Sequence, residues 1–302
     1  MAAVRVLTMN PELVSKLPDY LLKLRCRMNE LPKITSRDNQ RLVSARKIRD
    51  RHVSGKIFIE GKRLAVEALR SGLRISECFV SERFVMSDEN SGFIDQLSAS
   101  SRFTFELPDR VFHTIAATEH SQGVILISDR PEQGASAIES RLAEGRTLPI
   151  VILLYHINNP SNLGAVLRTA EAAGVAGVII TKHSADVYSP KSIRSSMGSA
   201  FRLAIWDDVE FAAAIKWAGA KGLVSTATAA SADAVHTAVD WSIPRLLVFG
   251  SEAHGLKGVD LGTEFDRVRI AIRPPVESLN LAVSAGIILF EAKRQLEAGS
   301  PI

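Results

Sequence analysis

Short continuous runs of apolar residues recur through the second half of the chain, and they limit the folds that it can adopt. Residues 150–155 (IVILLY) and 246–249 (LLVF) are two such runs, and segments of helical length lie between them. A run that is apolar at every position is typical of a strand buried on both faces, as in parallel sheets covered by helices. The second half is therefore predicted to be α/β, with a mostly parallel sheet and helices on both faces.

The first half of the chain has its own, shorter alternation of predicted helices and strands. A helix is predicted from about residue 36 to Gly55, strands and helices follow to about residue 130, and a polar stretch from Pro131 interrupts the pattern. We therefore predict four parts, which are an N-terminal extension (1–35), a smaller α/β domain (36–130), a linker (131–148) and a larger α/β domain (149–298).

The composition is that of a globular protein with a full core. The chain has 302 residues, of which 46% are hydrophobic and 23% are charged. No apolar stretch approaches the length of a membrane span, and no secretory signal is visible. The two cysteines, Cys26 and Cys78, offer at most one disulfide, and free thiols in a reducing cytoplasm are the preferred interpretation. We expect a cytoplasmic protein without a membrane partner.

Basic residues greatly outnumber acidic ones between residues 33 and 63, while the whole chain has a net charge of +4. Arg46, Lys47 and Arg49 lie together near the end of the helix predicted there. A solvated helix face and a binding surface for RNA phosphates explain this pattern about equally well. These three residues are candidate RNA contacts.

Three polar clusters follow predicted strands in the second half. They are NNPSNLG at residues 158–164, GSEAHG at 250–255 and PPVESLN at 274–280. Open α/β sheets collect ligands at the carboxyl ends of their strands. The clusters hold few strong nucleophiles, no set of metal ligands and no G-x-G-x-x-G fingerprint. We therefore expect mild chemistry with a bound cofactor and no metal, and a nicotinamide-dependent oxidoreductase is disfavoured.

Each cluster taken alone also has an ordinary structural explanation. Ser161 or Asn162 is suited to cap one helix, and Ser278 is suited to cap the last one. Arg168 is harder to explain in this way because it lies about one turn inside an otherwise apolar helix. A group that is always charged, near a strand end, can bind a phosphate or orient a hydroxyl.

Together the clusters resemble the three motifs of the SpoU, or TrmH-like, branch of the SPOUT RNA methyltransferases. The matching segments are NPSNLGAVLRTA at 159–170, LVFGSEAHGL at 247–256 and ESLNLAV at 277–283, with a similar connecting stretch at 188–199. Residues 36–130 resemble, more loosely, the L30e-like substrate-binding domain of ribosomal RNA 2′-O-methyltransferases, through FIEG at 58–61 and SQGV at 121–124.

The resemblance implies a deep trefoil knot in the C-terminal sheet, a homodimer and bound S-adenosylmethionine. The candidate cofactor-binding residues that it implies are Gly250, Ile272 and Leu279, with Thr226 as a further neighbour. Residues 272–276 form a shorter stretch than the family has there and lack its glycine, so the loop over the cofactor is expected to differ in shape.

The resemblance also implies catalytic roles. Arg168 would activate or orient a ribose 2′-hydroxyl, and Ser278 and Asn280 would place Arg168 and the substrate. Asn162 would shape the active-site loop and contact the partner subunit, and Glu252 would support the cofactor loop. Because a guanidinium is a weak base, orientation and stabilisation are preferred over deprotonation.

The leading functional prediction is methylation of a ribose 2′-hydroxyl in structured RNA, with ribosomal RNA as the first candidate. Transfer RNA is the alternative substrate. A catalytically silent RNA-binding or assembly protein of the same fold is a further alternative. The presence of Arg168, Glu252 and Asn280 argues against the silent protein.

Overall fold

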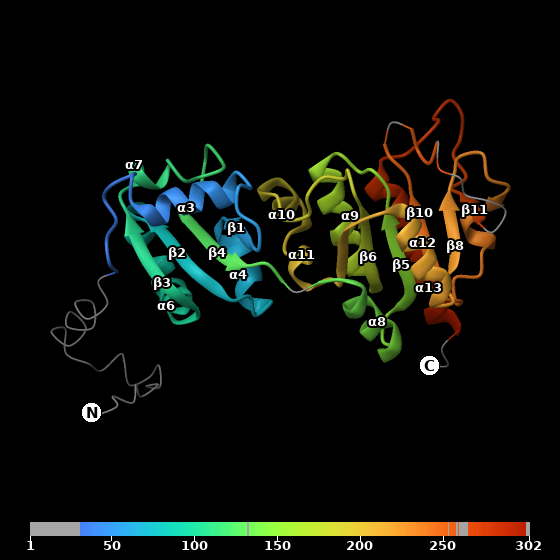
Figure 1. Cartoon of the computed structure of the whole chain (residues 1–302), viewed down its shortest axis with the longest axis horizontal. Helices are drawn as coiled ribbons and strands as arrows, with labels where there is room; N and C mark the ends of the chain where they lie inside the picture. Colours follow the sequence, from blue (N-terminus) through green and yellow to red (C-terminus); the bar gives the residue numbers. More distant parts are fainter. Residues whose placement is uncertain (1–30, 132, 253, 258, 260–264, 300–302) are drawn as a thin grey trace.

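The computed structural model describes residues 31–131, 133–252, 254–257, 259 and 265–299. Most of the predicted extension at residues 1–35, with Cys26 in it, lies outside these ranges. Figure 1 shows two sheets side by side along the long axis of the molecule, with α10 (Pro190–Ser196) and α11 (Ser199–Arg202) between them. No helix in the described part is long and apolar enough to cross a membrane.

The sheet of the N-terminal half has four strands in the order β1-β4-β2-β3. β2 and β3 are parallel, and the other neighbouring pairs are antiparallel. The strands are β1 (Lys56–Glu60), β2 (Ile75–Ser81), β3 (Ser101–Leu107) and β4 (Val124–Asp129). The helical segments around them are α3 (Gln40–Arg49), α4 (Lys62–Arg70), α5 (Glu82–Val85), η1 (Asp88–Asn90), α6 (Ser91–Ser100) and α7 (Asp109–Phe112).

Helix α3 is shorter than the helix predicted from about residue 36 to Gly55. Asn39 caps it by accepting a hydrogen bond from the backbone N–H of Arg41 at 3.0 Å. At the other end Arg51 has a φ of 68°, which no continuing helix allows. The buried residues of α3 are Leu42, Ala45 and Ile48, which form an apolar stripe at helical spacing.

The sheet of the C-terminal half has seven strands in the order β7-β6-β5-β10-β8-β11-β9, and every neighbouring pair is parallel. The strands are β5 (Leu148–Leu154), β6 (Val175–Thr181), β7 (Ile205–Val209), β8 (Val224–Thr228), β9 (Ala234–Val235), β10 (Arg245–Phe249) and β11 (Asp266–Arg269). The helical segments not yet named are α8 (Ala135–Glu144), α9 (Pro160–Ala173), α12 (Phe211–Ala220), η2 (His236–Ala238) and α13 (Leu281–Gly299).

Helices cover both faces of this sheet, as predicted. In β5, Ile152 and Leu154 belong to the core that contains α9 and α13. Val151 and Leu153 alternate with them and belong to the core that contains α8 and α12. Two-sided burial explains why β5 is apolar throughout, and the predicted α/β fold with a smaller N-terminal α/β domain is confirmed. The trefoil knot stays a prediction.

Two helix starts differ from the prediction. Asn159, and not Ser161 or Asn162, caps α9 by accepting a hydrogen bond from the backbone N–H of Ser161 at 2.9 Å. The prediction that Ser278 caps the last helix was also wrong, because α13 begins three residues later. Asn280 takes this position, and its Oδ1 accepts the N–H of Ala282 at 2.9 Å.

The segment predicted as a linker, residues 131–148, is largely helical. It contains α8, whose Ile138 is fully buried against the C-terminal sheet. A side chain on Gly177 in β6 would lie 2.6 Å from Ile138 Cγ1, so the helix and the strand are in close contact. The few apolar positions of α8 gave little periodic signal, although one of them anchors the helix. The division into four parts stays a prediction.

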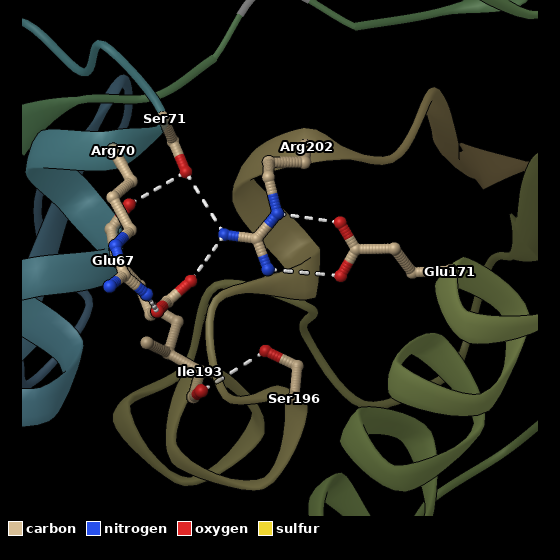
Figure 2. A network of polar contacts seen from close by, with 7 residues as sticks. All are labelled: Glu67, Arg70, Ser71, Glu171, Ile193, Ser196 and Arg202. Atoms are coloured by element: carbon tan, nitrogen blue, oxygen red, sulfur yellow. Dashed lines mark hydrogen bonds and ion pairs between the residues drawn. The ribbon is translucent and has the colours of Figure 1, made fainter.

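The two halves are joined by an arginine that contacts carboxylates from both (Figure 2). Arg202 of α11 binds Glu171 of α9 through Nε at 2.5 Å and Nη2 at 3.0 Å, and binds Glu67 of α4 through Nη1 at 2.7 Å. Burial alone would raise the pKa of Glu171, but hydrogen bonds from Arg202 and Ser199 lower this pKa on balance. The ionised carboxylate therefore stays paired across the interface.

The described cysteine, Cys78, is a free thiol buried in the N-terminal core. Burial raises its pKa to about 12. The thiol is therefore protonated at neutral pH and is a packing residue, not a nucleophile.

Candidate active site

A cavity of about 550 Å³ opens at the carboxyl ends of β8, β10 and β11. All three predicted motifs contribute to its lining, through Asn162, through the loop after β10 and through residues 277–281. The rest of the lining is largely apolar, with Phe249, Val268, Ile270 and Ile288 among the lining residues. A concave, mostly apolar cavity with a few convergent polar groups is the usual form of a small-molecule site.

Side-chain hydrogen bonds connect the three motifs. The amide nitrogen of Asn162 donates to Oε1 of Glu252. The amide nitrogen of Asn280 donates to Oδ1 of Asn162 at 3.2 Å. Residues separated by 90 and 118 positions in the chain thus form one polar chain at the mouth of the cavity. Asn162 sits in its centre, using its amide group as donor to one neighbour and as acceptor from the other.

The second motif forms a tight loop that requires a glycine at its first position. Ser251 and Gly255 exchange backbone hydrogen bonds of 2.9 and 2.8 Å, which close the loop. A Cβ atom on Gly250 would lie 2.2 Å from the carbonyl carbon of Gly255 and 2.6 Å from the nitrogen of Leu256. Because these are backbone atoms, no side chain fits without opening the loop. Ala253 of the motif lies outside the described residues.

Gly164 of the first motif has a packing role. A Cβ atom there would lie 2.5 Å from the carbonyl oxygen of Ser192 and 2.8 Å from the nitrogen of Ser196. The glycine therefore lets α9 approach the backbone of α10 directly. The predicted connecting stretch at residues 188–199 is thus in contact with the first motif.

Three of the four residues predicted to bind the cofactor line the cavity, namely Gly250, Ile272 and Leu279. Thr226 lies outside the lining and is fully buried within β8. Its Oγ1 accepts a hydrogen bond of 2.8 Å from Arg245, a buried arginine that also pairs with Asp266. Thr226 therefore satisfies a buried charge.

Thr228, two positions further along β8, does line the cavity together with Ala229 and Ala230. The sequence reasoning overlooked these residues and also Ser284, in the first turns of α13. The rule that ligands gather at strand ends applies to residue 228 as it does to the three clusters. The end of β8 at Thr228 therefore carries the same signal as the three clusters.

Of the five predicted catalytic residues, Asn162, Glu252, Ser278 and Asn280 line the cavity, whereas Arg168 does not. Arg168 is exposed on α9, about two turns beyond Asn162. Val283 and Phe290 of α13, the helix that packs beside α9, expose 51% and 48% of their surface. Two exposed apolar side chains thus lie on the helix that packs against α9, and one chain alone does not place Arg168 at the cavity.

The three candidate RNA contacts in α3 differ in their surroundings. Lys47 is exposed. Arg46 donates to Thr114 Oγ1 at 3.3 Å and to the carbonyl oxygen of Arg37 at 2.8 Å. Arg49 donates to the carbonyl oxygen of Ala116 at 3.0 Å. The two arginines thus also hold neighbouring segments in place. No group of three or more potential metal ligands occurs among the described residues.

Comparison with known proteins identifies both halves of the chain. Residues 149–290 match the model of the SpoU rRNA methylase family, and residues 39–126 match the model of the MRM3-like substrate-binding domain. An uncharacterized tRNA/rRNA methyltransferase of Synechocystis is 30% identical over 90% of this chain and 97% of its own length. A 23S rRNA guanosine-2′-O-methyltransferase of Bacillus subtilis is 26% identical over 87% of this chain and 100% of its own length.

The fold has a close match among solved structures. The crystal structure of an AdoMet-bound rRNA methyltransferase from Sinorhizobium meliloti superimposes with a TM-score of 0.75 at 27% identity, covering 89% of this chain and 99% of that one. The matches extend over both halves and include all three motifs. The chain therefore belongs to the SpoU rRNA methylase family of RNA methyltransferases.

Proposed function

We propose that this protein transfers a methyl group from S-adenosylmethionine to a ribose 2′-hydroxyl of ribosomal RNA. The observation that carries the proposal is the hydrogen-bonded chain Glu252–Asn162–Asn280 at the mouth of the cavity. It brings one residue of each motif to the same place. The Bacillus subtilis relative, named as a 2′-O-methyltransferase of 23S rRNA, supports the choice of acceptor group and of RNA.

The cavity fits S-adenosylmethionine in size and chemistry. Its volume of about 550 Å³ falls within the range of roughly 300–1,000 Å³ of small-molecule sites. Ile272 and Leu279 offer apolar contact. Gly250 also lines the cavity and has no side chain, so a ligand can approach its backbone closely. The Sinorhizobium meliloti neighbour has AdoMet bound. The cofactor would supply an electrophilic methyl group on its sulfonium.

The residues around the cavity would act mainly by positioning. A ribose hydroxyl is a poor nucleophile, and holding it in line with the methyl group supplies much of the acceleration that such a reaction needs. Asn280 and Ser278 line the mouth and would hold the hydroxyl and its neighbours. Glu252, fixed by Asn162, would keep the cofactor loop in shape. No metal enters the proposal.

Arg168 completes the proposed site only if a second copy of the chain contributes. It is exposed and stands apart from the cavity of its own chain. A homodimer that buries Val283 and Phe290 would cover the apolar surface of α13 and bring the adjacent α9 of one protomer toward its partner. Arg168 would then orient the hydroxyl and stabilise charge that develops on its oxygen.

Arg168→Ala tests the proposal. The variant should lose methyl transfer to rRNA by about 10²–10³-fold, the usual cost of removing one donor that stabilises developing charge. Folding should stay nearly unchanged because the side chain is exposed in the single chain, and dimerisation should persist because Val283 and Phe290 form the proposed contact. Transfer of labelled methyl groups to rRNA from cells that lack the protein measures the loss, with transfer RNA as the comparison substrate.

Lys216→Ala provides the matched control, since Lys216 is an exposed cation on α12, on the other face of the sheet. Near-normal turnover of Arg168→Ala would refute the assignment. Methylation of transfer RNA and not of rRNA would change the assigned substrate to transfer RNA. An absence of S-adenosylmethionine binding in calorimetry, even with RNA present, would favour a silent RNA-binding protein.

A further inference from the structure

A second cavity, of about 420 Å³, lies between the two halves of the molecule. Its walls come from the end of α3, the loop before β4, the first residue of α9 and the first turns of α10. The lining residues used below are Arg49, Asp50, Ala116, Pro160, Lys191 and Arg194. Both halves thus contribute basic side chains to one cleft.

The cleft carries more positive than negative charge. Arg49, Lys191 and Arg194 line it, against Asp50 as the acidic lining residue. Asp50 accepts a hydrogen bond of 2.7 Å from Arg49 Nε, and this bond lowers the pKa of Asp50. The positive charges of Lys191 and Arg194 are therefore the ones that face an incoming anion.

Arg194 contributes a charged group whose hydrogen-bonding capacity is not fully used within the protein. Its Nη1 is buried and has no hydrogen-bond partner among the described residues. A buried donor of a charged group without an acceptor destabilises the fold, and native proteins rarely leave one unsatisfied. An anionic oxygen bound in the cleft would provide this acceptor if the guanidinium turned its Nη1 toward the cleft.

The cleft adjoins the candidate active site. Pro160 lines the cleft and Asn162 lines the first cavity, and both belong to the first turn of α9. Residues two positions apart in a helix differ by only about 3 Å along its axis, but they project about 200° apart around it. The cleft and the first cavity therefore open on different sides of the first turn of α9, and an RNA strand whose ribose reaches the mouth of the first cavity would cross that turn to place a phosphate in the cleft.

The walls of the cleft are held in place within the protein. Arg49 Nη1 donates to the carbonyl oxygen of Ala116, and the N–H of Ala117 donates to the buried carboxylate of Glu60 at 2.9 Å. Arg51, just after α3, forms an ion pair with Asp186 of the other half. The cleft thus exists before a ligand arrives, which reduces the entropy lost on binding.

We propose that this interdomain cleft binds the phosphate backbone of the RNA substrate, with Lys191 and Arg194 as its principal contacts. The proposal rests on the proposed function, because it takes RNA as the substrate. A phosphate held here sets the distance between the RNA that the N-terminal domain binds and the ribose at the first cavity. The cleft is a binding subsite, and neither cation takes part in the chemical step.

The test compares Lys191→Ala and Arg194→Gln with the full-length wild-type protein, using 23S rRNA from cells that lack the protein. Filter-binding affinities are measured over a series of KCl concentrations. Each variant should bind more weakly, and the slope of log affinity against log salt should become shallower by about 0.7 for each lost contact with single-stranded RNA. Lys216→Ala removes one exposed charge far from the cleft and should leave the slope unchanged.

Unchanged affinity and slope in both variants would overturn the proposal. Arg194 is half-buried, whereas Lys191 is exposed, so Lys191→Ala decides the question even if Arg194→Gln fails to fold. Calorimetry with S-adenosylmethionine should give wild-type affinity for both variants. If the wild-type protein methylates no rRNA, the proposed function fails, and the binding series still shows whether the cleft holds RNA.

Discussion

Single residues at this site act through the backbone and through each other. Asn162 links the loop after β10 to the start of α13, because it contacts Glu252 and Asn280. Gly250 allows the loop to fold back on Gly255. Neither residue carries a charge or a nucleophile. Their value lies in placing other groups, which suits a reaction that depends on alignment.

Gly250→Ala should greatly weaken cofactor binding. The added methyl group would lie 2.4 Å from the carbonyl oxygen of Gly255, so the loop that lines the cavity has to open. We expect at least about a tenfold loss of S-adenosylmethionine affinity, equivalent to about 1.4 kcal/mol, measured by calorimetry.

Gly219→Ala is the control for that substitution. It lies in α12, nothing stands within 4 Å of the added atom, and alanine favours the helix by roughly 0.5–1 kcal/mol. Wild-type affinity in Gly250→Ala would mean that the cofactor does not contact this loop.

At the scale of elements, the burial of a strand influenced whether the sequence revealed it. The central strands β5, β6 and β10 are buried at nearly every residue, and their apolar runs predicted them. The strands that were missed, β3, β7 and β9, all lie at sheet edges. β7 reads IWDDV, with partly exposed acidic residues. β1 is also an edge strand, but four of its five residues are buried and it contains the apolar run Ile57–Ile59, so its sequence does indicate a strand.

The site was predictable to the extent that strand ends and motif order are local features. The sequence placed Gly250, Ile272 and Asn280 near one another because each follows a strand or precedes a helix. The sequence did not show that Arg168 lies away from the cavity of its own chain, or that Thr226 is hydrogen-bonded to Arg245. Those positions depend on contacts between segments that are distant in the chain, and no local pattern records them.

Helix α13 is held by a cluster of polar residues near its C-terminal end. Gln295 Oε1 accepts a hydrogen bond of 3.1 Å from the backbone N–H of Trp241, whose side chain is fully buried, and Gln295 Nε2 donates to the carbonyl oxygen of Val239. The same Nε2 donates to Glu291 at 2.9 Å. Hydrogen bonds from Arg294 and Gln295 lower the pKa of Glu291 to about 2. Glu291 thus orients the residue that anchors the helix.

Glu291→Gln should lower the melting temperature at neutral pH by roughly 1–3 °C. The folded-state pKa of about 2 is below the ordinary value of 4.5, so the ionised form stabilises the fold. The difference between variant and wild type should be fully present above pH 4.5 and should shrink as the pH falls from 4.5 toward 2. Circular dichroism melts at pH 7 and pH 2.5 measure it.

Glu297→Gln, on the same helix, is the control. Glu297 is 70% exposed and reaches Lys293 only at 3.9 Å, so its loss should have little effect at either pH. A pH-independent effect of Glu291→Gln would assign its role to packing and not to charge.

At the scale of the whole molecule, the N-terminal half is attached to the catalytic half at several separate points. Arg51 pairs with Asp186, Arg130 pairs with Asp207, and Arg202 connects Glu67 to Glu171. Glu171 is three residues beyond Arg168 on α9. The helix that carries the proposed catalytic arginine is thus tied to the substrate-binding half (Figure 2). This arrangement would fix the distance between the proposed RNA-binding surface and the proposed site of methyl transfer.

Glu67→Ala should weaken this connection while leaving the cofactor site intact. The interface is close here, since a Cβ atom on Gly198 would lie 2.6 Å from Glu67 Cβ, and alanine keeps that contact but removes the carboxylate. Arg202 then keeps Glu171 as its carboxylate partner within the catalytic half. We expect the KM for rRNA to rise several-fold, with kcat within about twofold of wild type. The substitution should remove binding energy that is shared by the bound substrate and the transition state, and such a loss raises KM without lowering kcat.

Arg70→Ala separates this effect from a general change in α4. Arg70 lies on the same helix, is 71% exposed and pairs with Glu67 from its own side of the interface. It should leave the KM near the wild-type value. S-adenosylmethionine affinity should be unchanged in both variants. An unchanged KM in Glu67→Ala would mean that the other attachment points fix the domains by themselves, whereas a fall in kcat with constant KM would place Glu67 in the support of α9 and Arg168.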